Sequence, residues 1–314
     1  MDRREFLKLG IASGVASTLG LQMADAGSLS IARRRLGKTG ERLSIIGLGG
    51  IVLMGNDQQN ANRIVAEAVE RGINYFDVAP SYGGGEAEEK MGPALEPYRK
   101  RVFLACKTTA RDKAGAAQEL QASLTRLRTD HIDLYQMHAL TTKEDVEKAL
   151  GPGGAIEAFR EARQKHTVRF LGFSAHSVEA ALLAMDRFEF DTILFPINWV
   201  CYLQGNFGPQ VLDRARSKGM GCLALKAMAR TSWPEGAKHD YPKCWYQPES
   251  DPQDAGLALR FALSQPITAA IPPGDERLFR LALSIAERFK PVTDEERKLL
   301  ESKAAALKPI FHNP

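Results

Sequence analysis

"VFLACKTTARDKAGAAQELQASLTRLRTDHIDLYQMH", residues 102–138, contains a strand, a helix and a second strand in that order. The runs Val102–Lys107 and Asp133–His138 are short and rich in β-branched, aromatic and other apolar side chains, as strands are. Between them, "AAQELQASLTRL" has apolar residues at helical spacing. A strand that leads through a helix to another strand predicts a parallel sheet.

The same alternation continues along the chain from Ile45. Amphipathic segments such as "NANRIVAEAVERG", "AIEAFREARQK" and "PQVLDRARSKG" separate the apolar runs, and several end at glycine, a common helix stop. Eight such units in about 250 residues fit a (β/α)8 TIM barrel better than an open sheet. The predicted strands are Ser44–Leu48, Tyr75–Val78, Val102–Lys107, Asp133–His138, Phe170–Ser174, Thr192–Pro196, Cys222–Leu225 and Thr268–Ile271.

Two segments depart from this alternation. "RRRLGKTGERLS", Arg33–Ser44, has turn residues between two short runs and predicts a β-hairpin ahead of the first barrel strand. Met228–Pro252 is rich in Pro, Trp and Tyr without a clear period, and a loop of this length in a compact domain is usually functional. Because no linker or low-complexity segment divides the chain, we predict one domain over residues 27–314.

The first 26 residues predict an export signal. "DRREFLKLG" has two arginines ahead of Phe-Leu-Lys, and it is followed by the weakly apolar "IASGVASTLGL" and the small-residue cleavage pattern Ala24–Ala26. This order resembles a twin-arginine signal, the bacterial route for proteins that fold before export. We therefore expect folding in the cytoplasm, recognition by the twin-arginine (Tat) export machinery and a mature protein in the periplasm. A basic N-terminal helix is the alternative.

Composition narrows the classes of protein that this chain can belong to. A hydrophobic content of 44% with 25% charged residues is ordinary for a soluble globular protein. The net charge of +4, with only one short basic block, gives little support to nucleic-acid binding, and the apolar N-terminal segment is too short to span a bilayer. No CxxC pair is present, so no zinc or iron–sulfur site is expected, and the sequence allows one disulfide without indicating its partners. The cysteines are Cys106, Cys201, Cys222 and Cys244.

Ionisable residues end three consecutive predicted strands. Asp77, Lys107 and His138 are separated by 30 and 31 residues, close to one strand–helix unit each. In a TIM barrel the carboxyl ends of the strands meet at one mouth, so these side chains are expected to converge there. Tyr82 lies in the glycine-containing loop after Asp77 and should reach the same place.

These four residue types together suit proton transfer to a carbonyl oxygen. A buried Lys107 beside a phenol is expected to lower the pKa of Tyr82 from about 10 toward working pH, while Asp77 keeps the lysine charged. Tyr82 would then be the general acid, and His138 would orient a substrate oxygen or share the proton. Because no side chain donates a hydride, a nicotinamide cofactor is implied.

The chain resembles an aldo-keto reductase from Arg33 to about Ile285. The motifs that carry the resemblance are "RRRLGKTGERLSIIGLGG", "GINYFDVAPSYGGGEAEEKMG", "VFLACKT", "LRTDHIDLYQMHAL" and "VRFLGFSAHS". The family implies a (β/α)8 barrel that reduces aldehydes and ketones reversibly with NAD(P)H. Its Asp, Tyr, Lys and His tetrad falls on Asp77, Tyr82, Lys107 and His138.

The resemblance also implies a cofactor face, which matches less well. The family usually has Asn where Ala175 stands, Gln where Asn198 stands and an aromatic residue where Leu225 stands. In "IPPGDERLFRLAL" the family's adenosine-phosphate loop implies that Arg277 faces a 2′-phosphate, so NADP(H) is favoured over NAD(H). The residues expected to contact the cofactor are Ser174, Asn198, Lys226 and Arg277, and no metal site is expected.

Other functions and structural roles compete with this interpretation. The chief alternative is a nicotinamide-binding sensor or partner protein with little turnover; a barrel hydrolase would need a metal or a carboxylate pair that the strand ends lack. Asp77 and Lys107 alone could form a structural ion pair. His176 and His239 are expected to be surface residues, and Cys106 should point away from the mouth because strand side chains alternate.

Overall fold

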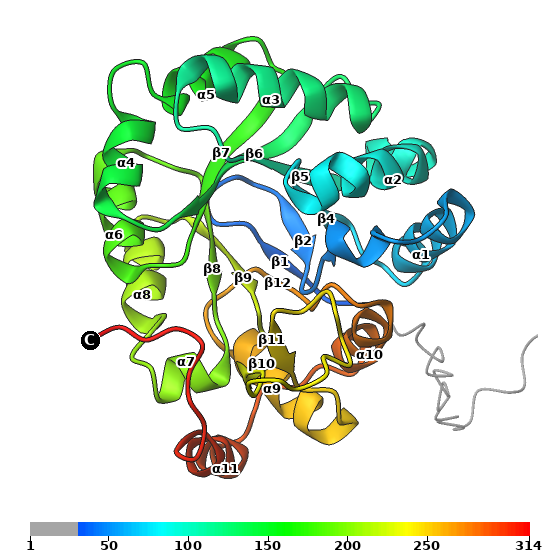
Figure 1. Ribbon diagram of the computed structural model, residues 1–314, viewed down its shortest axis with the longest axis vertical. Helices are drawn as coiled ribbons and strands as arrows, with labels where there is room; N and C mark the ends of the chain where they lie inside the picture. The colour runs from blue at the N-terminus through cyan, green and yellow to red at the C-terminus, as the bar shows by residue number, and fades with distance from the viewer. Residues whose placement is uncertain (1–30) are drawn as a thin grey trace, which may run out of the picture.

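Eight parallel strands form a nearly closed barrel in the computed structural model, which describes residues 31–314 (Figure 1). Neighbouring strands follow the order β3-β4-β5-β6-β7-β8-β9-β12, and a bridge between Ile46 and Ala270 joins the two ends. The predicted signal peptide, residues 1–26, lies outside the described residues. The barrel strands are β3 (Leu48–Gly49), β4 (Tyr75–Asp77), β5 (Phe103–Thr108), β6 (Ile132–Leu140), β7 (Val168–Ala175), β8 (Thr192–Pro196), β9 (Gly221–Leu225) and β12 (Ala269–Ile271).

Helices surround the barrel (Figure 1), and most of the α-helices begin at a short polar side chain. Asp112 and Thr142 each accept a hydrogen bond from a free backbone N–H in the first turn of the helix that follows, which stabilises the helix start. The α-helices are α1 (Gln58–Glu70), α2 (Glu86–Leu95), α3 (Lys113–Arg126), α4 (Lys143–Leu150), α5 (Ala155–Gln164), α6 (Val178–Arg187), α7 (Trp199–Leu203), α8 (Pro209–Ser217), α9 (Pro252–Ser264), α10 (Glu276–Glu287) and α11 (Asp294–Ala304). The 3-10 helices are η1 (Gly50–Leu53), η2 (Tyr82–Gly85) and η3 (Glu96–Arg101).

The predicted N-terminal hairpin is present as β1 (Arg33–Arg35) and β2 (Arg42–Ser44). Its residues Leu36 and Leu43 pack with the inward-facing side chains of the barrel strands, so the hairpin closes the barrel interior. Alternate strand residues face outward to the helices: Cys106 is buried, with its sulfur 3.6 Å from the Ser123 hydroxyl of α3. The prediction that Cys106 points away from the mouth is therefore confirmed.

The first barrel strand begins later than predicted. Ser44 ends the hairpin, and the strand β3 covers only Leu48–Gly49. The Ser44 hydroxyl donates to the Ile46 carbonyl at 2.7 Å, and its backbone N–H donates to the Asn74 side chain. These two hydrogen bonds fix the path of the chain between the hairpin and β3. The start of β3 is therefore set by polar contacts, which the apolar pattern of the sequence does not show.

The segment Met228–Pro252 is not irregular throughout. It contains the antiparallel pair β10 (Ala229–Ser232) and β11 (Tyr246–Pro248), with a non-repetitive segment between them. The C-terminal tail follows α11 and returns to the mouth, where the Asn313 N–H donates to the Gly205 carbonyl at 2.8 Å. Among residues 31–314, no helix has the length and apolarity needed to cross a membrane, and the four cysteines are free and buried.

Candidate active site

The carboxyl ends of β4, β5 and β6 bring the predicted tetrad together. Asp77 is aligned with Ala105 on β5, and Lys107 with Gln136 on β6, so Lys107 and His138 each lie two positions beyond the residue aligned with the preceding tetrad member. The long Lys107 side chain spans this step, since its amine reaches the Asp77 carboxylate. Tyr82 opens η2, in which three successive glycines have φ values of 63°, 64° and 105°. Glycine adopts this left-handed backbone without strain, which allows the chain to turn sharply after Tyr82.

Asp77 and Lys107 form a buried ion pair. The Lys107 amine donates to Asp77 Oδ1 and, at 3.1 Å, to the Val78 carbonyl; Asp77 is 2% exposed and Lys107 0%. The second carboxylate oxygen accepts from the Gln136 amide at 3.1 Å and from the Tyr75 hydroxyl at 3.3 Å. A buried pair is stable only when its remaining polar atoms are also bonded, and here Gln136 and Tyr75 supply those bonds.

Sequence reasoning did not find these two supporting residues. Gln136 lies two positions before His138 on β6, so strand alternation puts it on the same inward face, and that spacing was the available signal. Tyr75 lies two positions before Asp77 on β4 in the same way.

Tyr82 lies between Lys107 and His138. The Lys107 amine is 5.1 Å from the centre of the Tyr82 ring, and the ring meets His138 edge to face at 5.8 Å. The prediction that the pKa of Tyr82 lies below its usual value is wrong, although Lys107 does act in that direction. Burial raises the pKa of Tyr82 by more than the Lys107 charge lowers it, so the phenol stays protonated at neutral pH.

His138 is neutral at working pH. Burial, and then the positive charge of Lys107, lowers its pKa to about 3. Its Nδ1 lies 3.3 Å from the Ser81 hydroxyl, which fixes the orientation of the ring.

His176 belongs to the mouth of the barrel, so its prediction as a surface residue is wrong. Its Nε2 lies 3.2 Å from the Lys226 amine, and its ring stacks on Phe311 with centroids 5.4 Å apart. Burial, and then Lys226, lowers the pKa of His176 to about 3. The sequence prediction failed because Phe311 is contributed by the distant C-terminal tail.

His239 is exposed, as predicted, and stacks on Trp233.

The two partly buried histidines, His138 and His176, predict a loss of stability in mild acid. Below about pH 6.5 the unfolded chain takes up a proton at His138 and at His176, whereas the folded chain does so only near pH 3. Stability is therefore present above pH 6.5 and lost as the pH falls toward 3, by about 1 kcal/mol per pH unit for each histidine after allowance for partial exposure. Urea unfolding at pH 7 and pH 5 measures the loss.

The variant His176→Phe is the control for that experiment. It keeps an aromatic ring against Phe311 and removes one of the two titrating groups, so the loss between pH 7 and pH 5 should fall to about half. A loss as large as in the unaltered chain would assign the acid sensitivity to other groups.

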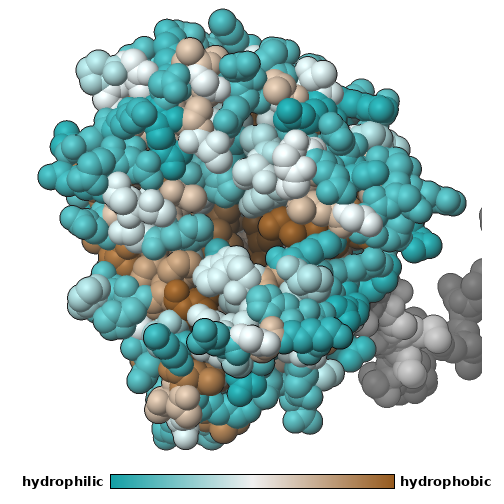
Figure 2. Space-filling view, viewed as in Figure 1, coloured by the Kyte–Doolittle hydropathy of each residue, from teal (hydrophilic) through white to brown (hydrophobic). Residues whose placement is uncertain are grey.

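A pocket of about 630 Å³, open space at its mouth included, adjoins the tetrad. It runs from Asp77 and Tyr82 past Leu225 and Lys226 to Pro272–Gly274. Figure 2 shows that this face of the molecule is hollowed near its middle, with apolar residues in the hollow.

The residues expected to contact a cofactor lie at the ends of β7, β8 and β9 and in α10. The Ser174 hydroxyl accepts from the Ala139 N–H at 2.7 Å. Asn198 is buried and caps α7 through its oxygen, which accepts from the Cys201 N–H, while its Nδ2 has no partner among the described residues. Lys226 lines the pocket.

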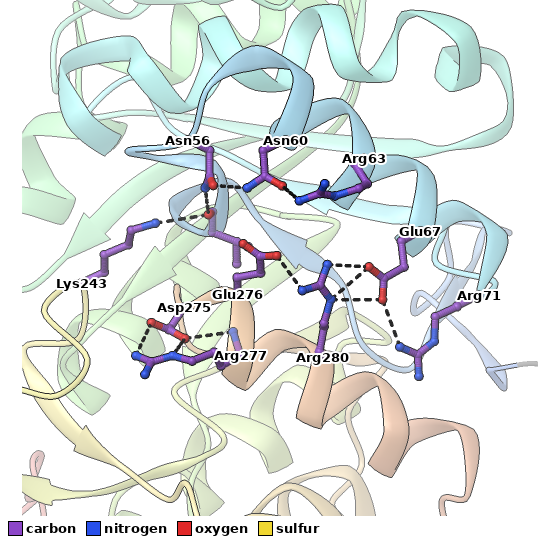
Figure 3. Close-up of polar contacts among 11 residues, drawn as sticks. Asn56, Asn60, Arg63, Glu67, Arg71, Lys243, Asp275, Glu276, Arg277 and Arg280 are labelled. Atoms are coloured by element: carbon purple, nitrogen blue, oxygen red, sulfur yellow. Dashed lines mark hydrogen bonds and ion pairs between the residues drawn. The ribbon is translucent and has the colours of Figure 1, made fainter.

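Arg277 lies farther out, in the first turn of α10 (Figure 3). Its guanidinium donates to Asp275 at 3.0 and 3.1 Å and lies over the ring of Tyr241, 4.5 Å from the centroid. Figure 3 also shows Lys243. Its amine donates to the backbone carbonyls of Ile51 at 3.3 Å and Val52 at 3.2 Å, both in η1. The segment between β10 and β11 is thereby tied to the opposite wall of the pocket.

These residues suit a nicotinamide dinucleotide. The pocket of about 630 Å³ is lined by Asp77 and Tyr82 of the tetrad and by the cationic side chains Lys226 and Lys243. The unpartnered Asn198 amide is a buried donor that a carboxamide or hydroxyl oxygen would satisfy. Ser174 and Asn198 would hold the nicotinamide end, and Arg277 would hold the adenosine end. Among residues 31–314, no three His, Cys, Asp or Glu side chains are grouped so as to hold a metal ion.

Comparison with known proteins identifies the class. The Aldo/keto reductase family matches residues 45–271, which is most of the chain. The chain therefore belongs to the Aldo/keto reductase family, and it is an oxidoreductase enzyme with the (β/α)8 fold of that family.

Individual proteins are similar to this chain over different shares of its length. The uncharacterized oxidoreductase YqkF of Bacillus subtilis is 28% identical over 299 residues, covering 86% of this chain and 95% of its own. The holo form of aldo-keto reductase AKR11C1 from Bacillus halodurans superposes with a TM-score of 0.71 at 26% identity, covering 90% of this chain and all of its own. A probable voltage-gated potassium channel subunit beta of Arabidopsis thaliana is 29% identical over 173 residues, about half of each chain.

Proposed function

We propose that this protein is an NAD(P)H-dependent oxidoreductase that reduces the carbonyl group of small aldehydes or ketones to an alcohol, reversibly. The observation that carries the proposal is the buried Asp77–Lys107 pair beside Tyr82 and His138, at a pocket of about 630 Å³ that Asp77 and Tyr82 themselves line. A reduced nicotinamide, if bound in that pocket, would supply the hydride.

The chain's own residues provide the proton and the orientation. Tyr82, protonated at neutral pH, donates a proton to the carbonyl oxygen as the oxygen gains negative charge. Lys107, held charged by Asp77, stabilises the phenolate that remains, because a nearby cation lowers the free energy of the charged form. His138, neutral and oriented by Ser81, donates a hydrogen bond to the same oxygen.

The cofactor is proposed to be NADP(H) in preference to NAD(H). Arg277 is an exposed cation at the start of α10, suited to a 2′-phosphate. Asp275 already occupies two of its N–H groups, so a phosphate must compete with that carboxylate. This competition limits the preference for NADP(H) over NAD(H).

The test is oxidation of the reduced cofactor by the chain without its first 26 residues. NADPH and NADH are each supplied with a panel of aldehydes and ketones, and a faster reaction with NADPH is expected. Oxidation that depends on the carbonyl compound supports the reductase.

A nicotinamide-binding sensor or partner protein is the second candidate. The similarity to a probable potassium channel subunit beta over half of the chain favours it. Tight binding of NADPH or NADH without oxidation by any carbonyl compound would favour this candidate and refute the first.

Export to the periplasm through the twin-arginine route is a further proposal, which rests on residues 1–26 alone. The full chain should fractionate with the periplasm, and replacement of Arg3 and Arg4 by lysine should retain it in the cytoplasm. An unchanged distribution would contradict the proposal.

Because this route exports folded proteins, we also propose that the cofactor is bound tightly enough to travel with the protein. Periplasmic protein free of cofactor would refute this second proposal.

A further inference from the structure

Lys226 is a cation without a counter-ion at the mouth of the barrel. It follows β9, and its φ of 62° lies in the left-handed region, which a residue with a side chain adopts only when its surroundings hold it there. No carboxylate of residues 31–314 pairs with its amine; the near neighbours are His176 Nε2 at 3.2 Å and the rings of Trp245 and Phe311, each 5.6 Å away at the centroid. Burial lowers the pKa of Lys226 to about 7.

The surroundings of the amine are fixed by contacts from separate parts of the chain. Phe311 stacks on His176 and on Phe207, with centroids 5.4 and 5.2 Å apart, and meets Trp245 at 5.9 Å. The tail that carries Phe311 is held by the hydrogen bond from Asn313 to Gly205. The amine therefore sits in a prebuilt cage of two aromatic rings and one imidazole, which lowers the entropic cost of binding a further group there.

The cage lies beside the tetrad. Lys226 lines the same pocket as Tyr82, and the Lys226 amine is close enough to contribute to the lowered pKa of His138, after burial and Lys107. A molecule whose carbonyl oxygen lies at Tyr82 and His138 can therefore extend toward the cage.

The direction of the lysine side chain separates the cage from the adenosine end of the pocket. In the strand order, β9 lies between β12 on one side and β8 and β7 on the other. The loop Pro272–Gly274 follows β12, whereas the Lys226 amine contacts His176, which follows β7. The amine thus extends away from the loop where Arg277 would meet a cofactor phosphate.

We propose that Lys226, with His176, binds an anionic group of the substrate, a carboxylate or a phosphate, so that the substrate is a small aldehyde or ketone that carries a negative charge. This proposal rests on the proposed reductase function. A desolvated ammonium without a counter-ion gains more from an anion than an exposed one does, and an ammonium that gives one N–H to His176 has two left for anion oxygens. It also gives Lys226 a role at the substrate instead of the contact with the cofactor that the sequence suggests.

The experiment uses matched pairs of substrates that differ in charge. Succinic semialdehyde is compared with its methyl ester for the carboxylate, and glycolaldehyde phosphate with glycolaldehyde for the phosphate. The unaltered chain should show a higher kcat/KM for the charged member of at least one pair. The variant Lys226→Met should reduce kcat/KM for that member about 10- to 100-fold, as expected for a lost charge-assisted hydrogen bond, and leave the neutral member within about threefold.

Two further variants serve as controls. Lys226→Arg keeps the charge and should retain most of the preference for the charged member. Lys218→Met removes a lysine on the outside of the barrel that pairs with Glu189, and it should change neither member of a pair.

The outcomes separate this proposal from the others. Equal losses on charged and neutral members, together with weaker NADPH binding in a fluorescence titration, would assign Lys226 to the cofactor and overturn the proposal. A chain that reduces carbonyl compounds without preferring the charged members would also overturn it while leaving the reductase function intact.

A chain that turns over no carbonyl compound would refute the proposed function, and the cage is then tested by binding alone. Succinate and inorganic phosphate are titrated against the unaltered chain and Lys226→Met, with the fluorescence of Trp245, which lies beside the amine, as the signal. Weaker binding of either anion by the variant supports the anion site; equal binding by both chains overturns it.

Discussion

The variant Tyr82→Phe is expected to reduce carbonyl substrates about 10²- to 10⁴-fold more slowly than the unaltered chain, the usual contribution of a general acid. The substitution removes only the hydroxyl, and the ring can keep its contacts with His138 and Lys107. The loss should therefore appear in kcat, with little change in cofactor affinity. Steady-state rates and a fluorescence titration of NADPH measure the two quantities.

The matched control for this variant is Tyr98→Phe, which removes a hydroxyl from η3, where the Tyr98 ring lies under the Arg101 guanidinium and does not line the pocket beside the tetrad. It should keep the full rate. If Tyr82→Phe retained more than a tenth of the rate, Tyr82 would not be the proton donor, and the neutral His138 would be the next group to test.

The variant Lys107→Met is expected to have the largest effect on stability as well as to abolish turnover. Lys107 is fully buried, and its removal leaves Asp77 as an unpaired buried carboxylate. Breaking one side of a buried ion pair typically costs about 3–5 kcal/mol of unfolding free energy, because the remaining charge is desolvated without compensation. Urea unfolding at pH 7 measures the cost.

The double variant Asp77→Asn/Lys107→Met separates stability from catalysis. It removes both charges and leaves Gln136 and Tyr75 with a neutral partner, so most of the lost stability should return while turnover stays absent. A single variant that lost less than about 1 kcal/mol would contradict the view that Lys107 is needed to compensate the buried Asp77 carboxylate.

Most of the fold was predictable from the sequence because the patterns involved are local. Seven of the eight predicted strands overlap the observed ones closely, and the hairpin at Arg33–Ser44 is present. The first barrel strand was displaced because side-chain bonds of Ser44 and Asn74, made across sequence-distant segments, set its start. The hairpin β10–β11 was missed because no alternating pattern marks strands of three and four residues.

The barrel, and the convergence of Asp77, Tyr82, Lys107 and His138 at one mouth, follow from sequence patterns, since residue type at successive strand ends is a local property that the barrel geometry converts into proximity. The protonation of Tyr82 does not follow from such patterns. Its pKa is raised because burial exceeds the effect of Lys107, and the depth of burial depends on the whole surrounding fold. The tertiary structure alone also brought His176 and Phe311 to the Lys226 amine. Contacts between residues so far apart along the chain have no periodic or spacing signal, because they depend on the path by which the C-terminal tail returns to the barrel.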